Sequence, residues 1–188
     1  AVRGLAVIAT HPVVIGVLSQ DATSESVTGR TTGFVNKAVE LGSAYGVVSV
    51  EGHDLWAAPA EGASIIVKVE ISATTNQTDV TNSANALLNT DGLIAIFCSN
   101  EGTVNGLLAA TADGTELADG ARFGDLIVGG FDAGATQKNA VRNGWFAGSV
   151  TQDPYNIGYL AVELAYKAAM GEEVADVDTG AKWYTAEN

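Results

Sequence analysis

The sequence predicts an α/β fold, a doubly wound and mostly parallel sheet with helices on both faces. Short apolar runs rich in Val and Ile alternate with stretches whose apolar residues recur at helical spacing. The chain has 188 residues, enough for one α/β domain with a core of its own. Apolar residues make up 47% and charged residues 16% of the chain, a composition typical of globular proteins.

The predicted strands are apolar runs of six to nine residues, several of them dominated by β-branched side chains. They cover residues 13–20, 64–72, 93–98, 125–131 and 145–150. The segment DVDTGAKWYT, residues 176–185, is expected to close the chain as an edge strand. The apolar stretches between the strands predict the helices that connect parallel neighbours.

The first predicted helix runs from about residue 30 to residue 41 and carries Phe34, Ala38 and Leu41 along one face. Further helices are expected at residues 79–89, 103–111, 135–143 and 155–170. Residues 43–63 fit neither pattern, and the sequence alone gives no structural account of this insert. Trp56 within it could stack on a ligand, but packing against the protein is the more ordinary role of such a side chain.

The helix at 155–170 is apolar on nearly every side, and Glu163 and Lys167 form its one pair of opposite charges at i,i+4 spacing. Exposing four of its large apolar side chains would forgo roughly 6–12 kcal/mol of burial. We therefore expect residues 1–154 and 172–188 to form a ligand-binding lobe, and residues 155–171 to need cover from elsewhere. That cover could come from the sheet itself, from a second copy of the chain or from another lobe.

The charge of the chain argues against nucleic acid as a partner. Asp and Glu number 22 against nine Lys and Arg, so the net charge is −13, and no basic cluster offsets it. Neutral or cationic small ligands are more compatible with such a surface. His11 and His53 stand alone without a second ligand at metal spacing, and Cys98 lies inside an apolar run, so neither a metal site, a cofactor nor a nucleophilic thiol is expected.

No apolar run approaches the 18 residues that a membrane-spanning helix needs. The first residues, AVRGLAVIATHP, lack the basic start and the cleavage site of a signal peptide, so any export signal is expected to have been removed already.

Polar side chains follow several of the predicted strands at the point where each strand ends. Arg30 comes after the loop that follows the first strand, Asn100 follows the third, Asp132 the fourth and Gln152 the fifth. Doubly wound sheets bind ligands beyond the carboxyl ends of their strands. The guanidinium of an Arg donates, an Asp carboxylate accepts, and the amides of Asn and Gln do both. Such a set suits a ligand with many hydroxyl groups, because every hydroxyl both donates and accepts hydrogen bonds. Each residue could instead cap the next helix or hydrogen-bond to the loop backbone.

Enzymatic activity is the first competing interpretation, because Asp132 and Arg30 together resemble a pair of catalytic residues. The sequence contains no GxSxG, no GxGxxG after a strand and no Walker lysine. Enzymatic activity is therefore not expected.

Three segments resemble the ribose-type periplasmic sugar-binding proteins of ABC importers. They are GVLSQDATSESVTGRTTGF, LLNTDGLIAIFCSNEGTVNGLL and GGFDAG…AVRNGWFAGSVTQDPYNIGYLAVELAYKAAMGEEV, and they occur in family order. The resemblance covers residues 13–42 and 64–188 and corresponds mainly to the C-terminal lobe of that family. The N-terminal lobe, with the aromatic residues that stack on a sugar ring, has no counterpart here.

The resemblance implies a function and a set of partners. The chain would be a solute-binding component of a carbohydrate importer, located in the periplasm or another extracytoplasmic space, with the membrane permease as its partner. Arg30, Asn100, Asp132 and Gln152 would be the contribution of this lobe to recognising a sugar or polyol. The ligand-sensing domain of a transcriptional regulator or of a membrane receptor shares the architecture and remains an alternative.

Overall fold

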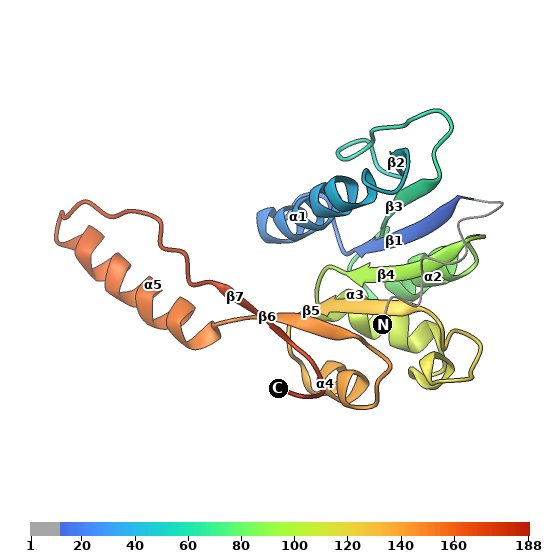
Figure 1. Cartoon of the computed structure of the whole chain (residues 1–188). Coiled ribbons are helices and arrows are strands. Elements are labelled where there is room, and N and C mark those ends of the chain that lie inside the picture. Colours follow the sequence, from blue (N-terminus) through green and yellow to red (C-terminus); the bar gives the residue numbers. More distant parts are fainter. Residues whose placement is uncertain (1–11) are drawn as a thin grey trace.

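The structure is a computed structural model, and it describes residues 12–188. His11 lies outside the described residues. In the described part of the chain, seven strands form one sheet in the order β2-β3-β1-β4-β5-β6-β7 (Figure 1). All neighbouring strands run parallel except β6 and β7, which are antiparallel. This confirms the predicted fold class, and β7 lies at an edge as expected.

The strands and helices alternate along the chain as in other doubly wound sheets. The strands are β1 (Val13–Ser19), β2 (Val48–Glu51), β3 (Ile65–Ile71), β4 (Leu93–Cys98), β5 (Ile127–Phe131), β6 (Gly148–Gln152) and β7 (Ala181–Tyr184). The helices are α1 (Glu25–Gly42), α2 (Gln77–Leu88), α3 (Glu101–Ala110), a 3₁₀ turn (Thr115–Leu117), α4 (Ala135–Arg142) and α5 (Pro154–Ala169).

Two apolar clusters hold the layers together, one on each face of the sheet. The cluster under α2, α3 and α4 includes Leu18, Leu87, Ile96 and Leu107, which are almost completely buried. The cluster under α1 contains side chains of β1, β3 and β4. Their alternation along the strands assigns successive residues to opposite faces, which is why the central strands are apolar on both sides.

Several element boundaries differ from the prediction: β5 begins at Ile127 rather than residue 125, and β7 begins at Ala181 rather than residue 176. Two further differences have local reasons. Helix α1 begins at Glu25, five residues earlier than expected, because the Asp21 carboxylate accepts hydrogen bonds from the amides of Thr23 and Ser24 and starts the turn there. Strand β6 begins at Gly148 rather than residue 145, because Phe146 is buried in the core at the end of α4 instead of extending the strand.

The insert at residues 43–63 is part of the lobe. It contains β2, which pairs in parallel with β3 and extends the sheet by one edge strand. Trp56 is 8% exposed, belongs to the cluster under α1 and donates a hydrogen bond from Nε1 to Thr32 Oγ1 at 2.8 Å. The side chain packs on α1, so its role is structural.

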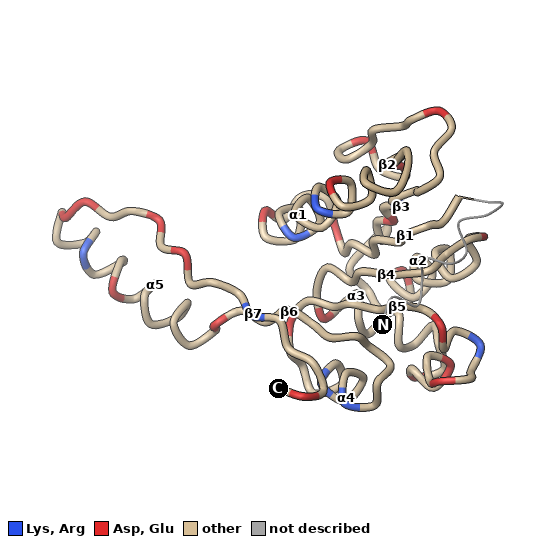
Figure 2. Tube along the Cα trace, viewed as in Figure 1, with Lys and Arg blue, Asp and Glu red and all other residues tan. Residues whose placement is uncertain are grey.

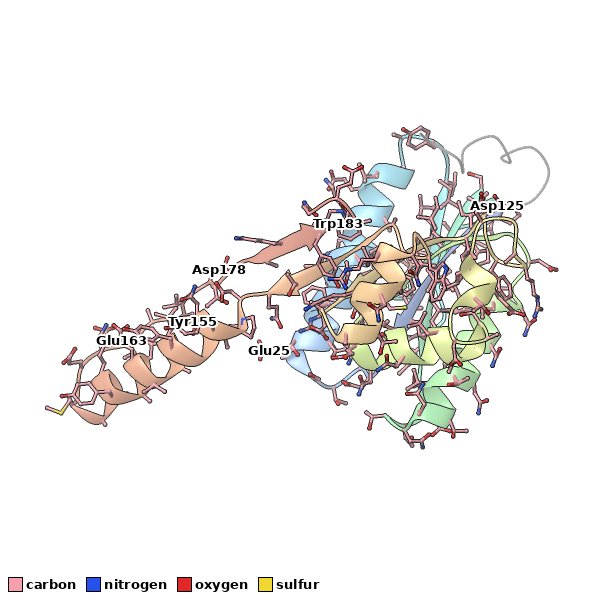
Figure 3. The ribbon with its side chains drawn as sticks, turned by 90° about the horizontal axis from the view of Figure 1, so that it is seen from below. Glu25, Asp125, Tyr155, Glu163, Asp178 and Trp183 are labelled. Carbon is pink, nitrogen blue, oxygen red and sulfur yellow. The ribbon has the colours of Figure 1, made fainter. Side chains whose placement is uncertain are left out.

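Helix α5 extends away from the sheet as an arm and returns through an irregular segment to β7 (Figure 1). Within the described part of the chain, none of its residues is buried, and Tyr155, Tyr159, Val162 and Tyr166 are each at least 60% exposed. Figure 3 labels Tyr155 and Glu163 on this helix and Asp178 on the returning segment, all away from the body of the sheet.

Figure 2 shows several red positions and one blue position along the arm. The sequence of this segment has five acidic residues, Glu163, Glu172, Glu173, Asp176 and Asp178, and one basic residue, Lys167. Lys167 Nζ donates to Glu163 Oε1 at 2.6 Å, as the i,i+4 spacing predicted. The described helices include none that is long and apolar enough to cross a membrane.

Candidate functional site

The carboxyl ends of β1, β4, β5 and β6 meet at one edge of the sheet, and two of the predicted residues, Asp132 and Gln152, converge there on Arg30. Arg30 Nη2 donates to Gln152 Oε1 at 3.0 Å, and Arg30 Nη1 lies 3.6 Å from Asp132 Oδ2. Nη1 also donates to the carbonyl oxygen of Ser99 at 3.2 Å. One guanidinium thus connects α1 with β4, β5 and β6.

The Arg30 side chain is held by stacking as well as by hydrogen bonds. Its guanidinium carbon lies 3.9 Å from the centre of the Phe131 ring, a cation–π contact. One turn later in α1, Phe34 stacks on Phe97 of β4, with ring centres 4.5 Å apart and nearly parallel planes. These two contacts fix the helix over the sheet, and the Arg30 side chain is only 13% exposed.

Asp132 occupies an unusual backbone conformation. Its φ of 83° lies in the left-handed region, which costs a non-glycine residue about 1–3 kcal/mol. Asp132 Oδ2 accepts a hydrogen bond from the backbone amide of Glu101 at 3.0 Å, at the start of α3. The side chain remains 30% exposed, so the same carboxylate faces solvent beside Arg30.

Asn100 has a helix-capping role. Its side-chain oxygen accepts a hydrogen bond from the backbone amide of Thr103 at 3.0 Å. The Thr103 hydroxyl accepts one from the backbone amide of Asn100 at 3.1 Å, and the two bonds together form a capping box. Its side-chain nitrogen donates to Gln20 Oε1. Asn100 therefore adjoins the cluster through Ser99, but both ends of its amide are engaged in the lobe itself. The contacts of Asn100 are therefore those of a helix cap, the alternative to ligand binding that the sequence left open.

The prediction missed groups that complete the rim. The Ser99 carbonyl and the amide of Glu101 act through the backbone, which side-chain chemistry does not reveal. Gln20 sits directly after β1, but its position inside the predicted strand concealed it. Phe131 lies in a predicted strand, where an aromatic side chain is expected to pack in the core. Only the position of Arg30 over its ring shows that Phe131 also holds the guanidinium.

The rim is an open surface rich in hydrogen-bonding groups. A guanidinium fork, a carboxylate and an amide lie within one cluster, and together they both donate and accept. A cavity of about 760 Å³ lies elsewhere, at the amino ends of β1 and β4 beside Val13, Lys68 and Thr90, and none of the four candidate residues lines it.

The described residues provide neither a metal-binding cluster nor an exposed thiol at this edge of the sheet. Residues 12–188 contain no group of three or more His, Cys, Asp or Glu side chains placed to hold a metal ion. Cys98 is completely buried in the core, and burial raises the pKa of its thiol. A protonated, inaccessible thiol is unsuited to nucleophilic attack.

Comparison with known proteins identifies the family. Residues 9–173 match the periplasmic binding protein domain. A structure from Brachyspira murdochii, described as an ABC transporter, LacI family transcriptional regulator, is 37% identical, with a TM-score of 0.76 over 96% of this chain and 55% of that one. No curated protein matches the chain.

Two further solved structures share the fold. One is a carbohydrate transporter solute-binding protein from Agrobacterium radiobacter in complex with D-arabinose, 24% identical with a TM-score of 0.69 over 94% of this chain and 52% of that one. The other is an ABC transporter solute-binding protein from Agrobacterium vitis with bound D-fucose, 23% identical with a TM-score of 0.69 over 95% and 53%. The chain thus spans about half the length of these proteins. It belongs to the periplasmic-binding-protein family and corresponds to one lobe of that fold.

Proposed function

We propose that the chain is a lobe of the solute-binding component of a carbohydrate ABC importer and holds a small sugar or polyol at the carboxyl-end rim of its sheet. The observation that carries the proposal is the convergence of Asp132 and Gln152 on Arg30. These groups offer fixed donors and acceptors to adjacent hydroxyls. The sugars named with the two Agrobacterium structures support the ligand class.

Ligand binding would replace contacts that now close the cluster within the lobe. Arg30 uses both terminal nitrogens on protein acceptors, and a ligand hydroxyl can accept from one of them while donating to Asp132. Asn100 would take part through its side-chain nitrogen, which now binds Gln20. Hydrogen bonds that involve a guanidinium or a carboxylate are stronger than those between neutral groups.

A second lobe would supply the opposite rim. Two-lobed binders close around a ligand by a hinge motion, which surrounds it with contacts from both sides. If the closed site binds at micromolar concentration, about −8 kcal/mol, half of the contacts give about −4 kcal/mol, or millimolar binding. The exposed α5 is proposed to pack on that lobe, which would also explain why it covers nothing here.

The ligand-sensing domain of a regulator or receptor is the second candidate. The Brachyspira structure supports this candidate, because that protein is described both as an ABC transporter and as a LacI family transcriptional regulator. The partner would then be a DNA-binding or signalling protein instead of a permease. Fractionation of the native host separates the two: an importer component is expected in the extracytoplasmic fraction, and a transcriptional regulator inside the cell.

The binding proposal is tested by a thermal-shift screen of monosaccharides, polyols and amino acids at high millimolar concentration. We expect one sugar class to raise the melting temperature, and Asp132→Ala to remove the shift through loss of about 1.5–3 kcal/mol of binding. Arg30→Lys should lose most of the shift too, because an ammonium cannot reproduce the planar fork. Asp91→Ala, at an exposed position distant from the rim, is the control. Equal shifts in the wild type and Asp132→Ala would contradict the proposal.

A further inference from the structure

The backbone of Asp132 is held by three hydrogen bonds from residues that lie outside the candidate rim. Its amide donates to the carbonyl oxygen of Val150 at 2.7 Å. Its own carbonyl oxygen accepts from Ser149 Oγ and from the hydroxyl of Tyr184, both at 3.0 Å. Because the residue has a left-handed φ, these bonds maintain a conformation that the chain would otherwise avoid.

A buried amide stands behind Ser149. Gln137 of α4 is completely buried, and its Nε2 donates to the carbonyl oxygen of Phe131 at 3.1 Å and to Ser149 Oγ. The Ser149 hydroxyl accepts this hydrogen bond and donates its own to the carbonyl oxygen of Asp132. Both carbonyls on either side of the Phe131–Asp132 peptide junction are therefore fixed by one polar network. Gln137 contributes through Nε2 alone, because its Oε1 has no hydrogen-bond partner among the described residues.

Tyr184 brings the end of the chain into this network. It is the last residue of β7 and lies opposite Ser149 in the antiparallel pair with β6. In Figure 3 the neighbouring Trp183 marks β7 between the sheet and the arm that carries α5. Burial raises the pKa of Tyr184, the nearby Ser149 side chain opposes this shift, and the carboxylates of Asp132 and Glu101 raise the pKa further, so the Tyr184 hydroxyl stays a donor at neutral pH.

We propose that Tyr184 is a positioning residue, whose hydroxyl sets the direction of the Asp132 carboxylate toward Arg30 and the amide of Glu101. The pairing of β7 with β6 thereby controls whether the Asp132 carboxylate points in the direction that ligand binding needs. The consequence for ligand binding rests on the proposed function, but the positioning itself does not. The arm that precedes β7 is thus coupled to Asp132 through this hydrogen bond, in addition to the pairing of β7 with β6, which ends at Gln152.

The first test needs no ligand and compares Tyr184→Phe with Tyr45→Phe. Tyr45 is 61% exposed at the end of α1 and serves as the matched control. Hydrogen exchange of the Glu101 amide, measured by NMR, reports the Asp132 carboxylate that accepts from it. We expect at least tenfold faster exchange at Glu101 in Tyr184→Phe, with unchanged exchange in the central strands and in Tyr45→Phe. Unchanged exchange at Glu101 would overturn the proposal.

The second test uses D-arabinose, titrated into the wild type and the same variants. Tyr184→Phe should weaken binding about fivefold, and should have no further effect in an Asp132→Ala background, because the hydroxyl acts through Asp132. Equal weakening in that background would overturn the positioning role.

Two outcomes remain to be separated. If the wild type binds neither D-arabinose nor another sugar, the proposed function fails. The positioning role of Tyr184 is then tested by hydrogen exchange at the Glu101 amide alone. If Tyr184→Phe does not fold, Ser149→Ala removes the other donor to the same carbonyl. It should produce the same faster exchange at Glu101, and a normal rate there would overturn the proposal.

Discussion

At the residue scale, the site depends on side chains whose positions are fixed by their own lobe. Arg30 is stacked on Phe131 and hydrogen-bonded to residues at the ends of β4 and β6, and Asp132 is held in a conformation that few residues adopt. Preorganised groups lose little freedom when a ligand arrives. The strain at Asp132 is the cost of placing a carboxylate at the end of β5 beside the start of α3.

That strain predicts a difference between two substitutions at the same position. Asp132→Gly and Asp132→Ala both remove the carboxylate, but glycine adopts a positive φ without steric cost. We expect Asp132→Gly to be more stable than Asp132→Ala by about 1 kcal/mol in urea unfolding. The same pair at Asp91, which has no positive φ, should show no advantage for glycine. Equal stability of the two Asp132 variants would mean that the conformation carries no strain.

At the element scale, helix starts and edge strands position the rim. The sequence predicted the order and type of most elements, because the alternation of Val-rich strands and periodic helices is strong. It missed β2, since four residues between polar loops carry too little pattern, and it placed the start of α1 too late. It predicted that polar residues would gather at the strand ends. Which of them would meet was not predictable, because contacts such as Arg30 with the Ser99 carbonyl depend on tertiary packing.

The start of α1 should depend on pH through Asp21. Partial burial raises the pKa of Asp21, but the amides of Ser24 and Thr23 and the Thr23 hydroxyl outweigh it, so the pKa is lowered overall. A lowered pKa in the folded state stabilises the protein above the ordinary pKa of Asp, and this contribution is lost as the pH falls through the lowered value. Asp21→Ala should therefore be destabilised by about 1 kcal/mol at pH 7 and by less at pH 3. Urea unfolding at both pH values checks this, and an equal difference at pH 3 would contradict it.

The insert is expected to stabilise the lobe through Trp56. Trp56→Ala should cost about 3–5 kcal/mol, because it empties a buried site in the cluster under α1 and removes the bond to Thr32. Trp56→Phe should cost less, since the ring volume is largely kept. Leu55→Ala is the control, because Leu55 is 57% exposed. A Trp56→Ala protein as stable as the wild type in chemical unfolding would show that the insert is dispensable.

At the scale of the whole molecule, the lobe and its arm have opposite characters. The sheet has a core on each face, whereas α5 presents large apolar side chains to solvent. Burying four of them is worth roughly 6–12 kcal/mol, which is comparable to the net stability of a domain. This is the expectation for a helix that packs on a second lobe.

The chain on its own is therefore expected to self-associate. Light scattering at micromolar concentration should give a mass above the 19.2 kDa of one chain. Replacing Tyr155, Tyr159 and Val162 of α5 by Ser should restore the monomer without unfolding the sheet, because none of them is buried there. A compact, stable wild-type monomer would contradict this prediction.

The central claim, that a sugar binds at the rim around Arg30, is tested most directly by NMR titration of the ¹⁵N-labelled chain with D-arabinose and D-fucose. The account predicts shifts in the Arg30 Nε–H signal, in the side-chain amides of Asn100 and Gln152 and in the backbone amide of Glu101. Shifts confined to the cavity beside Lys68 and Thr90, or no shift at Arg30 at saturating sugar, would contradict it.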